Sequence, residues 1–213
     1  MAALETGSLA VYVVTSVGLA PGRGHRDVAI AAIDGGATAI QLRAPELSDE
    51  QLRPLAAELA ERSRAAGVLF VVNDRIDVAA RTGVGVHVGQ DDDHSDARRR
   101  MGSEAVLGIS VSSPPEAMEA EHAGADYLGV TVWSTATKPE AVPVGLEGLR
   151  AVVDATSLPV VAIGGIDADN ARQALEAGAA GVAVVSAVGA APDPVAATRR
   201  LVDAVRAAEV GRP

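Results

Sequence analysis

The chain has 213 residues, 48% apolar but only 2% aromatic, so a sizeable core must consist mainly of Val, Ala, Leu and Ile. The formal net charge of −10 argues against nucleic-acid binding, because that affinity depends on Lys and Arg neutralising phosphates. The chain has no cysteine, no membrane-length apolar run and no leader-like segment, which excludes disulfides and predicts a cytoplasmic protein without a membrane partner.

Short runs rich in Val, Ile and Leu alternate along the chain with longer segments of helical period. Their spacing of roughly 20 to 30 residues fits repeated βα units. Eight such units predict an α/β fold, a single (β/α)₈ TIM barrel that occupies residues 1–213 as one domain. An open doubly wound sheet is the alternative, but the segment 15–22 lacks its Gly-rich fingerprint. The eight runs are Leu9–Thr15, Thr38–Leu42, Leu69–Val72, Gly85–Val88, Ala105–Ser110, Tyr127–Val130, Val160–Ile163 and Gly181–Val184.

Helix boundary signals fall between these runs. Ser48 followed by Gln51 predicts a capping box at the start of a long helix, which Gly67 ends. Paired prolines after the fifth run suit the first turn of another helix. The other predicted helices run from Pro114 to about His122, from Asn170 to Gly178 and from Pro192 to Val210.

Polar residues follow the second run. In a TIM barrel, ligands bind where strands end, so such residues are candidates for the site. Period-two alternation places Gln41 and Arg43 on the same side of the strand. Arg43 offers a planar fork for phosphate oxygens, although a salt bridge to a neighbouring loop would also explain it. Gln41 inside an apolar barrel needs a partner, which favours contact with a ligand.

Acidic residues follow the third and fourth runs. Asn73 and Asp74 come directly after the third run, and Asp91–Asp93 follow the fourth. Because adjacent strands end side by side, Asp74 and one later aspartate could share Mg²⁺, which accepts one or two carboxylates plus phosphate oxygens. The alternatives are a helix cap at Asp74 or Asp77 and a solvated acidic loop. His87 lies inside the fourth run, and we expect a core histidine hydrogen-bonded to the backbone.

The remaining strand ends carry hydroxyls, glycines and a lysine. Ser110 closes the fifth run, and the loop 133–138 contains Thr-x-Thr-Lys, which is either an anion cradle or simply an exposed loop. Gly164 and Gly165 follow the seventh run, and Ser186 follows the eighth. Loops after strands seven and eight recurrently form a phosphate site in this fold, because glycine lets backbone N–H groups approach the anion.

Taken in order, these motifs resemble the thiamine-phosphate synthase family. Each motif alone is weak, but the ordered set is specific and extends from about Leu9 to Ser186. The motifs are Gln41-Leu-Arg43, Asn73-Asp74-Arg75-x-Asp77, Gly85-Val-His-Val-Gly89-Gln90-x-Asp92, Gly108-x-Ser110, Gly124-Ala-Asp-Tyr-Leu-Gly129, Thr135-x-Thr137-Lys138, Ala162-Ile-Gly164-Gly165-Ile166 and Gly181-Val-Ala-Val-Val-Ser186.

The resemblance implies a TIM-barrel transferase with phosphorylated small molecules as substrates. Such an enzyme joins a hydroxymethylpyrimidine diphosphate to a thiazole phosphate and releases diphosphate. The resemblance also implies Mg²⁺ bound by Asp74 and Asp92, and it leaves a homo-oligomer open. The residues implied in catalysis are Arg43, Ser110 and Lys138, and those implied in substrate binding are Gln41, Arg43, Asn73, Ser110, Thr135, Thr137, Lys138, Gly165, Val185 and Ser186.

Three departures from the family pattern define the alternatives. Pro45 stands where the family usually has a second diphosphate-binding cation. Ser112 stands where the family often has His, and residues 129–133 replace a segment that usually carries a Gly-Pro pair. One alternative is a thiazole tautomerase, which relies on a His at position 112 for proton transfer. The other is a non-catalytic homologue that binds only thiazole phosphate, which Pro45 motivates.

Overall fold

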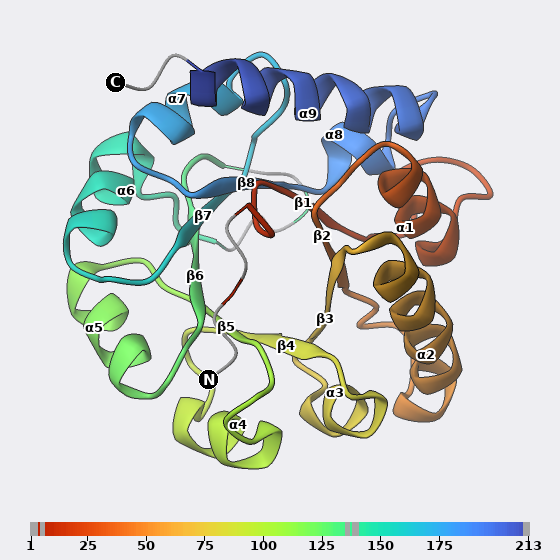
Figure 1. Cartoon of the computed structure of the whole chain (residues 1–213), viewed down its shortest axis with the longest axis horizontal. Coiled ribbons are helices and arrows are strands. Elements are labelled where there is room, and N and C mark those ends of the chain that lie inside the picture. Colours follow the sequence, from red (N-terminus) through yellow and green to blue (C-terminus); the bar gives the residue numbers. More distant parts are fainter. Residues whose placement is uncertain (1–3, 5–6, 135–136, 138–140, 211–213) are drawn as a thin grey trace.

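A closed barrel of eight parallel strands forms the centre of the molecule (Figure 1). The computed structural model describes Leu4, residues 7–134, Thr137 and residues 141–210. Each strand pairs with the next along the chain, and β8 pairs with β1 to close the ring. The strands are β1 (Val11–Val14), β2 (Ala39–Leu42), β3 (Leu69–Asn73), β4 (Gly85–Val88), β5 (Leu107–Ser110), β6 (Tyr127–Thr131), β7 (Val160–Ile163) and β8 (Gly181–Val184).

Helices surround the barrel on its outer side (Figure 1). The predicted TIM barrel is confirmed, and each strand lies within two residues of its predicted run at either end. Among the described residues, none of the helices has the length and apolarity that a membrane crossing requires. The helices are α1 (His25–Asp34), α2 (Asp49–Ala66), α3 (Ile76–Thr82), α4 (His94–Met101), α5 (Pro114–His122), α6 (Gly145–Asp154), α7 (Ala171–Glu176), α8 (Ser186–Gly189) and α9 (Pro194–Val210).

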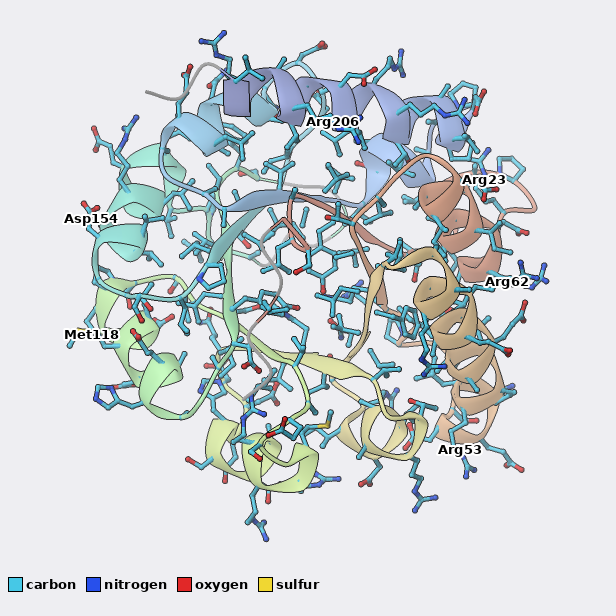
Figure 2. The ribbon with its side chains drawn as sticks, in the orientation of Figure 1. Arg23, Arg53, Arg62, Met118, Asp154 and Arg206 are labelled. Atoms are coloured by element: carbon cyan, nitrogen blue, oxygen red, sulfur yellow. The ribbon has the colours of Figure 1, made fainter. Side chains whose placement is uncertain are left out.

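Two apolar layers follow from the alternation of side chains along the strands. Side chains that point outward, such as Ile40 and Leu128, pack with the helices in the larger cluster. Side chains that point inward, such as Tyr12, Val71 and Tyr127, form a smaller cluster inside the barrel. Many charged side chains lie on the outer surface, where Arg53 and Arg62, labelled on α2, face away from the barrel (Figure 2). The interior is therefore free for a few specific polar groups.

Glycine makes room for the largest of these interior side chains. A Cβ atom at Gly108 would lie 2.1 Å from the Tyr127 Cζ atom, so only glycine fits on β5 beside that ring. A Cβ atom at Gly129 would lie 3.1 Å from the His87 Cε1 atom, which is also a crowded contact. The barrel can therefore hold Tyr127 and His87 side by side, with ring centroids 5.4 Å apart.

Helix ends agree with the sequence signals except at two places. Ser48 and Gln51 form the predicted capping box of α2, and Gly67 ends that helix with a positive φ of 68°. The alternative in which Asp74 or Asp77 caps the next helix is wrong, because Arg75 occupies the N-cap of α3 and supplies no side-chain bond. The short helix α8 was not predicted, because four residues are too few to carry a helical period.

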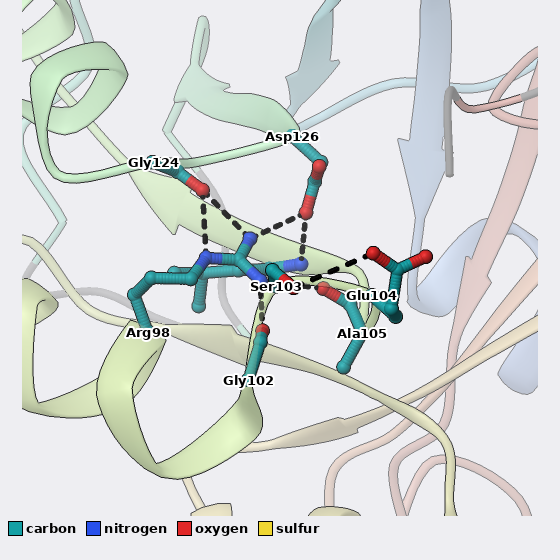
Figure 3. Close-up of polar contacts among 8 residues, drawn as sticks. Arg98, Gly102, Ser103, Glu104, Ala105, Gly124 and Asp126 are labelled. Carbon is teal, nitrogen blue, oxygen red and sulfur yellow. Dashed lines mark hydrogen bonds and ion pairs between the residues drawn. The ribbon is translucent and has the colours of Figure 1, made fainter. Parts of the chain in front are cut away.

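A largely buried ion pair joins the helix layer to the other end of the barrel, where strands begin. Arg98 on α4 donates to the carbonyl oxygens of Gly102, Ala105 and Gly124 and to the Asp126 carboxylate at 2.6 Å (Figure 3). The same Asp126 oxygen accepts from the Leu107 backbone N–H at 2.7 Å. Both charges are therefore fully engaged, as a buried pair requires.

We expect Asp126→Ala to destabilise the fold by about 3 kcal/mol, because it leaves the largely buried Arg98 without its opposite charge and the Leu107 N–H without an acceptor. Urea unfolding followed by circular dichroism measures this loss. The control is Glu176→Ala, which removes an exposed carboxylate from its ion pair with Arg172. Equal unfolding midpoints for the two variants would contradict a stabilising role for this pair.

Candidate active site

A pocket opens where the strands end, at the mouth of the barrel. The space in and above it is about 960 Å³, a volume that includes open solvent at the mouth. Apolar side chains of β1, β7 and β8 form one part of its wall, and polar side chains of β2 to β6 form another. The lining residues are Tyr12, Val14, Gln41, Arg43, Asn73, His87, Ser110, Tyr127, Gly129, Thr131, Thr137, Ala141, Val161, Ile163, Gly164, Gly165, Ile166, Ala183, Val184, Val185 and Ser186.

Most of the residues singled out by sequence line this pocket. Asp74 and Asp92 are exposed and do not line it, while Thr135 and Lys138 lie outside the described residues. The predicted residues around the pocket are Gln41, Arg43, Asn73, Ser110, Thr137, Gly165, Val185 and Ser186.

Arg43 is the arginine of the pocket wall. It is half-buried, and within the described part of the chain no hydrogen bond or ion pair occupies its guanidinium group. The alternative of a salt bridge to a neighbouring loop therefore finds no partner among those residues. A guanidinium group in a pocket wall, with N–H donors that no described residue uses, can bind a phosphate or diphosphate group.

A chain of hydrogen bonds links five side chains at the pocket, and each link is 2.9 Å long. The Gln41 amide nitrogen donates to the Tyr12 hydroxyl, which contacts the Tyr127 hydroxyl. Tyr127 contacts His87 Nδ1, and His87 Nε2 contacts the Ser110 hydroxyl. The chain joins β2, β1, β6, β4 and β5, so one polar network fixes side chains from five strands.

His87 differs from its sequence prediction. We expected hydrogen bonds to the backbone, but its two ring nitrogens contact the side chains of Tyr127 and Ser110. Tyr12 and Tyr127 were not predicted to belong to the site. The available signal was that both tyrosines of the chain lie on predicted strands of a barrel whose interior has few other large side chains.

Both tyrosine hydroxyls are held neutral. Burial raises the pKa of Tyr12 well above its ordinary value of 10.0, and hydrogen bonds from Tyr127 and Gln41 offset only part of that effect. Burial also raises the pKa of Tyr127, and repulsion from Tyr12 adds to the shift. Both phenols can therefore donate and accept hydrogen bonds without carrying charge.

The two candidate metal ligands follow adjacent strands. The Asp74 backbone N–H donates to the His87 carbonyl oxygen at 2.8 Å, so Asp74 begins its loop beside β4. Asp92 follows β4, and its carboxylate accepts from the Gly89 N–H at 2.7 Å. Within the ranges that the structure describes, no three His, Cys, Asp or Glu side chains cluster around a common metal position.

Asp74 has an unusual backbone conformation. Its φ of 61° is the one positive value among the described residues other than glycine. This left-handed conformation costs about 1 to 2 kcal/mol for a residue with a Cβ atom. Such strain at a strand end beside a pocket is typical of functional sites and motivates a role for this carboxylate.

Glycines after β7 form a tight turn against the loop that follows β6. Gly164 and Gly165 have φ values of 92° and 62°. A Cβ atom at Gly164 would lie 2.5 Å from the Trp133 carbonyl oxygen. The Asn170 side chain holds the turn by donating to the Gly165 carbonyl oxygen at 2.8 Å. The sequence alone suggested this glycine turn, and the structure places it in the wall of the pocket.

Ser112 follows β5 and is engaged in the first turn of α5. Its backbone N–H donates to the Glu116 carboxylate at 2.7 Å, and its hydroxyl donates to the same group at 3.0 Å. A hydroxyl bonded in this way is a poor general base, because serine has no accessible basic form near neutral pH.

Fold and pocket together define a class of protein. A TIM barrel with an arginine fork that no described residue occupies, a glycine turn after β7 and polar side chains at its mouth is suited to phosphorylated small molecules. Solved structures of low identity agree with the fold alone. One is 3-hexulose-6-phosphate synthase, 19% identical over 92% of this chain and 99% of that chain, with a TM-score of 0.69.

Relatives of higher sequence identity, together with a family profile, identify the family of this chain. The profile of thiamine monophosphate synthase matches residues 11–188, and the chain belongs to that family. Thiamine-phosphate synthase from Chloroflexus aurantiacus is 50% identical over 90% of both chains. The one from Natronomonas pharaonis is 50% identical over 94% of this chain and 96% of that protein. A structure of thiamine phosphate pyrophosphorylase from Pyrococcus furiosus has a TM-score of 0.86 and 40% identity over 94% of this chain and 97% of that chain.

The tyrosine pair predicts how the fold responds to alkaline pH. Both folded-state pKa values are raised above the unfolded value of about 10. Their contribution to stability is therefore fully present below about pH 10 and is lost as the pH rises toward the folded values. We expect tyrosine ionisation, followed by near-ultraviolet absorbance, to coincide with unfolding seen by circular dichroism. Ionisation of either tyrosine in the folded chain near pH 10 would contradict this account.

Proposed function

We propose that this chain is a thiamine-phosphate synthase, which joins 4-amino-2-methyl-5-hydroxymethylpyrimidine diphosphate to thiazole phosphate and releases diphosphate. The observation that supports the proposal is the pocket itself, because eight of the predicted site residues surround one cavity in a chain of that family. The reaction needs no nucleophilic side chain. The protein must instead bind the leaving diphosphate and orient two rings.

Arg43 is the proposed main protein contact of the diphosphate. Its guanidinium fork is unoccupied within the described residues and can donate to two phosphate oxygens at once. Asn73 and Ser110 line the same part of the pocket and supply neutral donors. Lys138 is proposed as a second cation on the basis of the family motif alone. Positive charge at this point stabilises the negative charge that develops on the leaving group.

Mg²⁺ is proposed as the cofactor, with Asp74 and Asp92 as its protein ligands. Two exposed carboxylates that follow neighbouring strands fit the chemistry of this ion, which commonly uses one or two carboxylates together with phosphate oxygens and water. No cluster of three or more acidic, histidine or cysteine side chains lies among the described residues, so the proposal rests on the family motif and on the positions of these two strand ends. When bound, the ion would neutralise charge on the diphosphate.

The thiazole phosphate is proposed to bind on the opposite wall. Gly165, Val185 and Ser186 bring backbone N–H groups and a hydroxyl to the loops after β7 and β8, and Thr137 lines the pocket beside them. Thr135 is assigned here from the motif. These donors would hold the phosphate while the thiazole nitrogen faces the pyrimidine methylene carbon.

The pyrimidine is proposed to contact Gln41. The hydrogen bond from Gln41 to Tyr12 fixes the amide, so its orientation is set before any substrate binds. The hydrogen-bond network that continues to Ser110 presents further donors and acceptors inside the barrel. A preorganised polar wall of this kind binds a heteroaromatic ring in one orientation.

Neither alternative function is favoured. A tautomerase would need a base at position 112, where the Ser112 hydroxyl is bonded to Glu116. A non-catalytic homologue would need no unoccupied arginine for diphosphate, and the close relatives are named as synthases. The test of the proposal is a coupled assay for diphosphate release with both substrates and Mg²⁺. Binding of both substrates without release of diphosphate would refute it.

We expect Asp92→Ala to lower Mg²⁺-dependent turnover by at least about a hundredfold, because charge neutralisation on the leaving group is lost. Steady-state diphosphate release at saturating Mg²⁺ measures the effect. The matched control is the exposed neighbour Asp91→Ala, which should stay within about twofold of wild type. Wild-type turnover of Asp92→Ala would remove Asp92 from the metal site.

A further inference from the structure

A second hydrogen-bond chain lies behind Arg43, outside the pocket wall. The Arg43 backbone N–H donates to the Thr15 hydroxyl oxygen at 3.2 Å. The same oxygen lies 2.9 Å from His25 Nδ1, and His25 Nε2 lies 2.6 Å from the Glu46 carboxylate. The chain thus begins at the backbone of the proposed diphosphate ligand and returns to its own loop three residues later.

Burial makes this chain rigid. Thr15 is fully buried and His25 is 5% exposed, while the Glu46 side chain remains 42% exposed. Because the Glu46 carboxylate is an acceptor, the hydrogen on His25 Nε2 must point to it. With both ring nitrogens bonded, the imidazole cannot rotate without losing a hydrogen bond, and the Thr15 hydroxyl is fixed by its two neighbours.

The loop between β2 and α2 is held at further points. The Leu47 N–H donates to the Ala44 carbonyl oxygen at 3.2 Å, which closes a turn, and Pro45 fixes its own φ inside that turn. On the far side, Arg75 pairs with Asp49 at 3.3 Å. The His25–Glu46 contact therefore completes a set of restraints that surrounds the residue bearing the guanidinium fork.

The charge of Glu46 would by itself oppose anion binding. Burial raises the pKa of its carboxyl group, but the hydrogen bond from His25, with help from its backbone and from the charges of His25 and Arg43, brings the pKa below its ordinary value. An ionised carboxylate this close to Arg43 weakens the local positive potential that a diphosphate needs. A role for Glu46 that helps binding must therefore come from geometry.

We propose that His25 and Glu46 are positioning residues for Arg43, and that they hold its backbone so that the guanidinium faces the diphosphate before substrate binds. This inference rests on the proposed function. Preorganisation of a flexible arginine lowers the entropic cost of binding, which is the gain that offsets the unfavourable charge of Glu46.

The experiment compares two substitutions at Glu46. Glu46→Ala removes the acceptor for His25, whereas Glu46→Gln keeps an acceptor and removes only the charge. We expect the full-length Ala variant to bind inorganic diphosphate with Mg²⁺ about tenfold more weakly by calorimetry, and the Gln variant to bind within about twofold of wild type or more tightly. A pure charge effect would instead tighten binding in both variants and would overturn the inference.

Further variants separate positioning from general loss of structure. His25→Ala should reproduce Glu46→Ala, and Thr15→Ser should retain the affinity that Thr15→Val loses. The matched control is Glu58→Ala, which removes a carboxylate ion-paired with Arg26, the neighbour of His25, and should leave binding unchanged. Thiazole phosphate affinity should stay constant in Glu46→Ala, and an equal loss for both ligands would contradict positioning of Arg43.

A double-mutant cycle completes the test. In an Arg43→Ala background, Glu46→Ala should have no further effect on diphosphate affinity, because the group it positions is absent. A full tenfold loss in that background would overturn the inference. Diphosphate binding by wild type without turnover of the two substrates would refute the proposed function alone, and unchanged affinity in Glu46→Ala would refute only the positioning role.

Discussion

Closure of the barrel by the pairing of β8 with β1 is the constraint on which the rest of the structure depends. It brings the carboxyl ends of eight strands to one rim, so residues far apart in the sequence share one pocket. It also buries the inward face of every strand, which forces any polar group there to find a partner. The chain from Gln41 to Ser110 is the result of that requirement.

One hydrogen-bond network holds the Gln41 side chain inside the barrel, and the other holds the Arg43 backbone from outside the pocket. Inside the barrel, hydroxyl, amide and imidazole groups joined by hydrogen bonds form part of the pocket wall. Behind the wall, Thr15, His25 and Glu46 restrain the backbone of the β2–α2 loop. The chemistry proposed for this site needs little covalent participation, so accurate placement of binding groups is the main contribution the protein can make.

Much of the fold and part of the site could be predicted from the sequence because their signals are local. The spacing of the apolar runs indicated the eight βα units, and the Ser48 capping box and Gly67 marked the ends of α2. Period-two alternation placed Gln41 and Arg43 on one face, and both line the pocket. The metal role of Asp74 and Asp92 stays a prediction, and Thr135 and Lys138 lie outside the described residues.

By itself, the sequence determined the barrel, its order of strands and the polar residues at each strand end, since these depend on local periodicity and chain order. Only the tertiary structure decided which side chains meet. Tyr12 and Tyr127 are 115 residues apart and touch because opposite parts of the barrel wall face each other across its interior. His87 was expected to bond the backbone, yet the space left by Gly108 and Gly129 brings it to Tyr127 and Ser110. Contacts across a closed barrel depend on which volumes remain empty, and local sequence patterns carry no record of that.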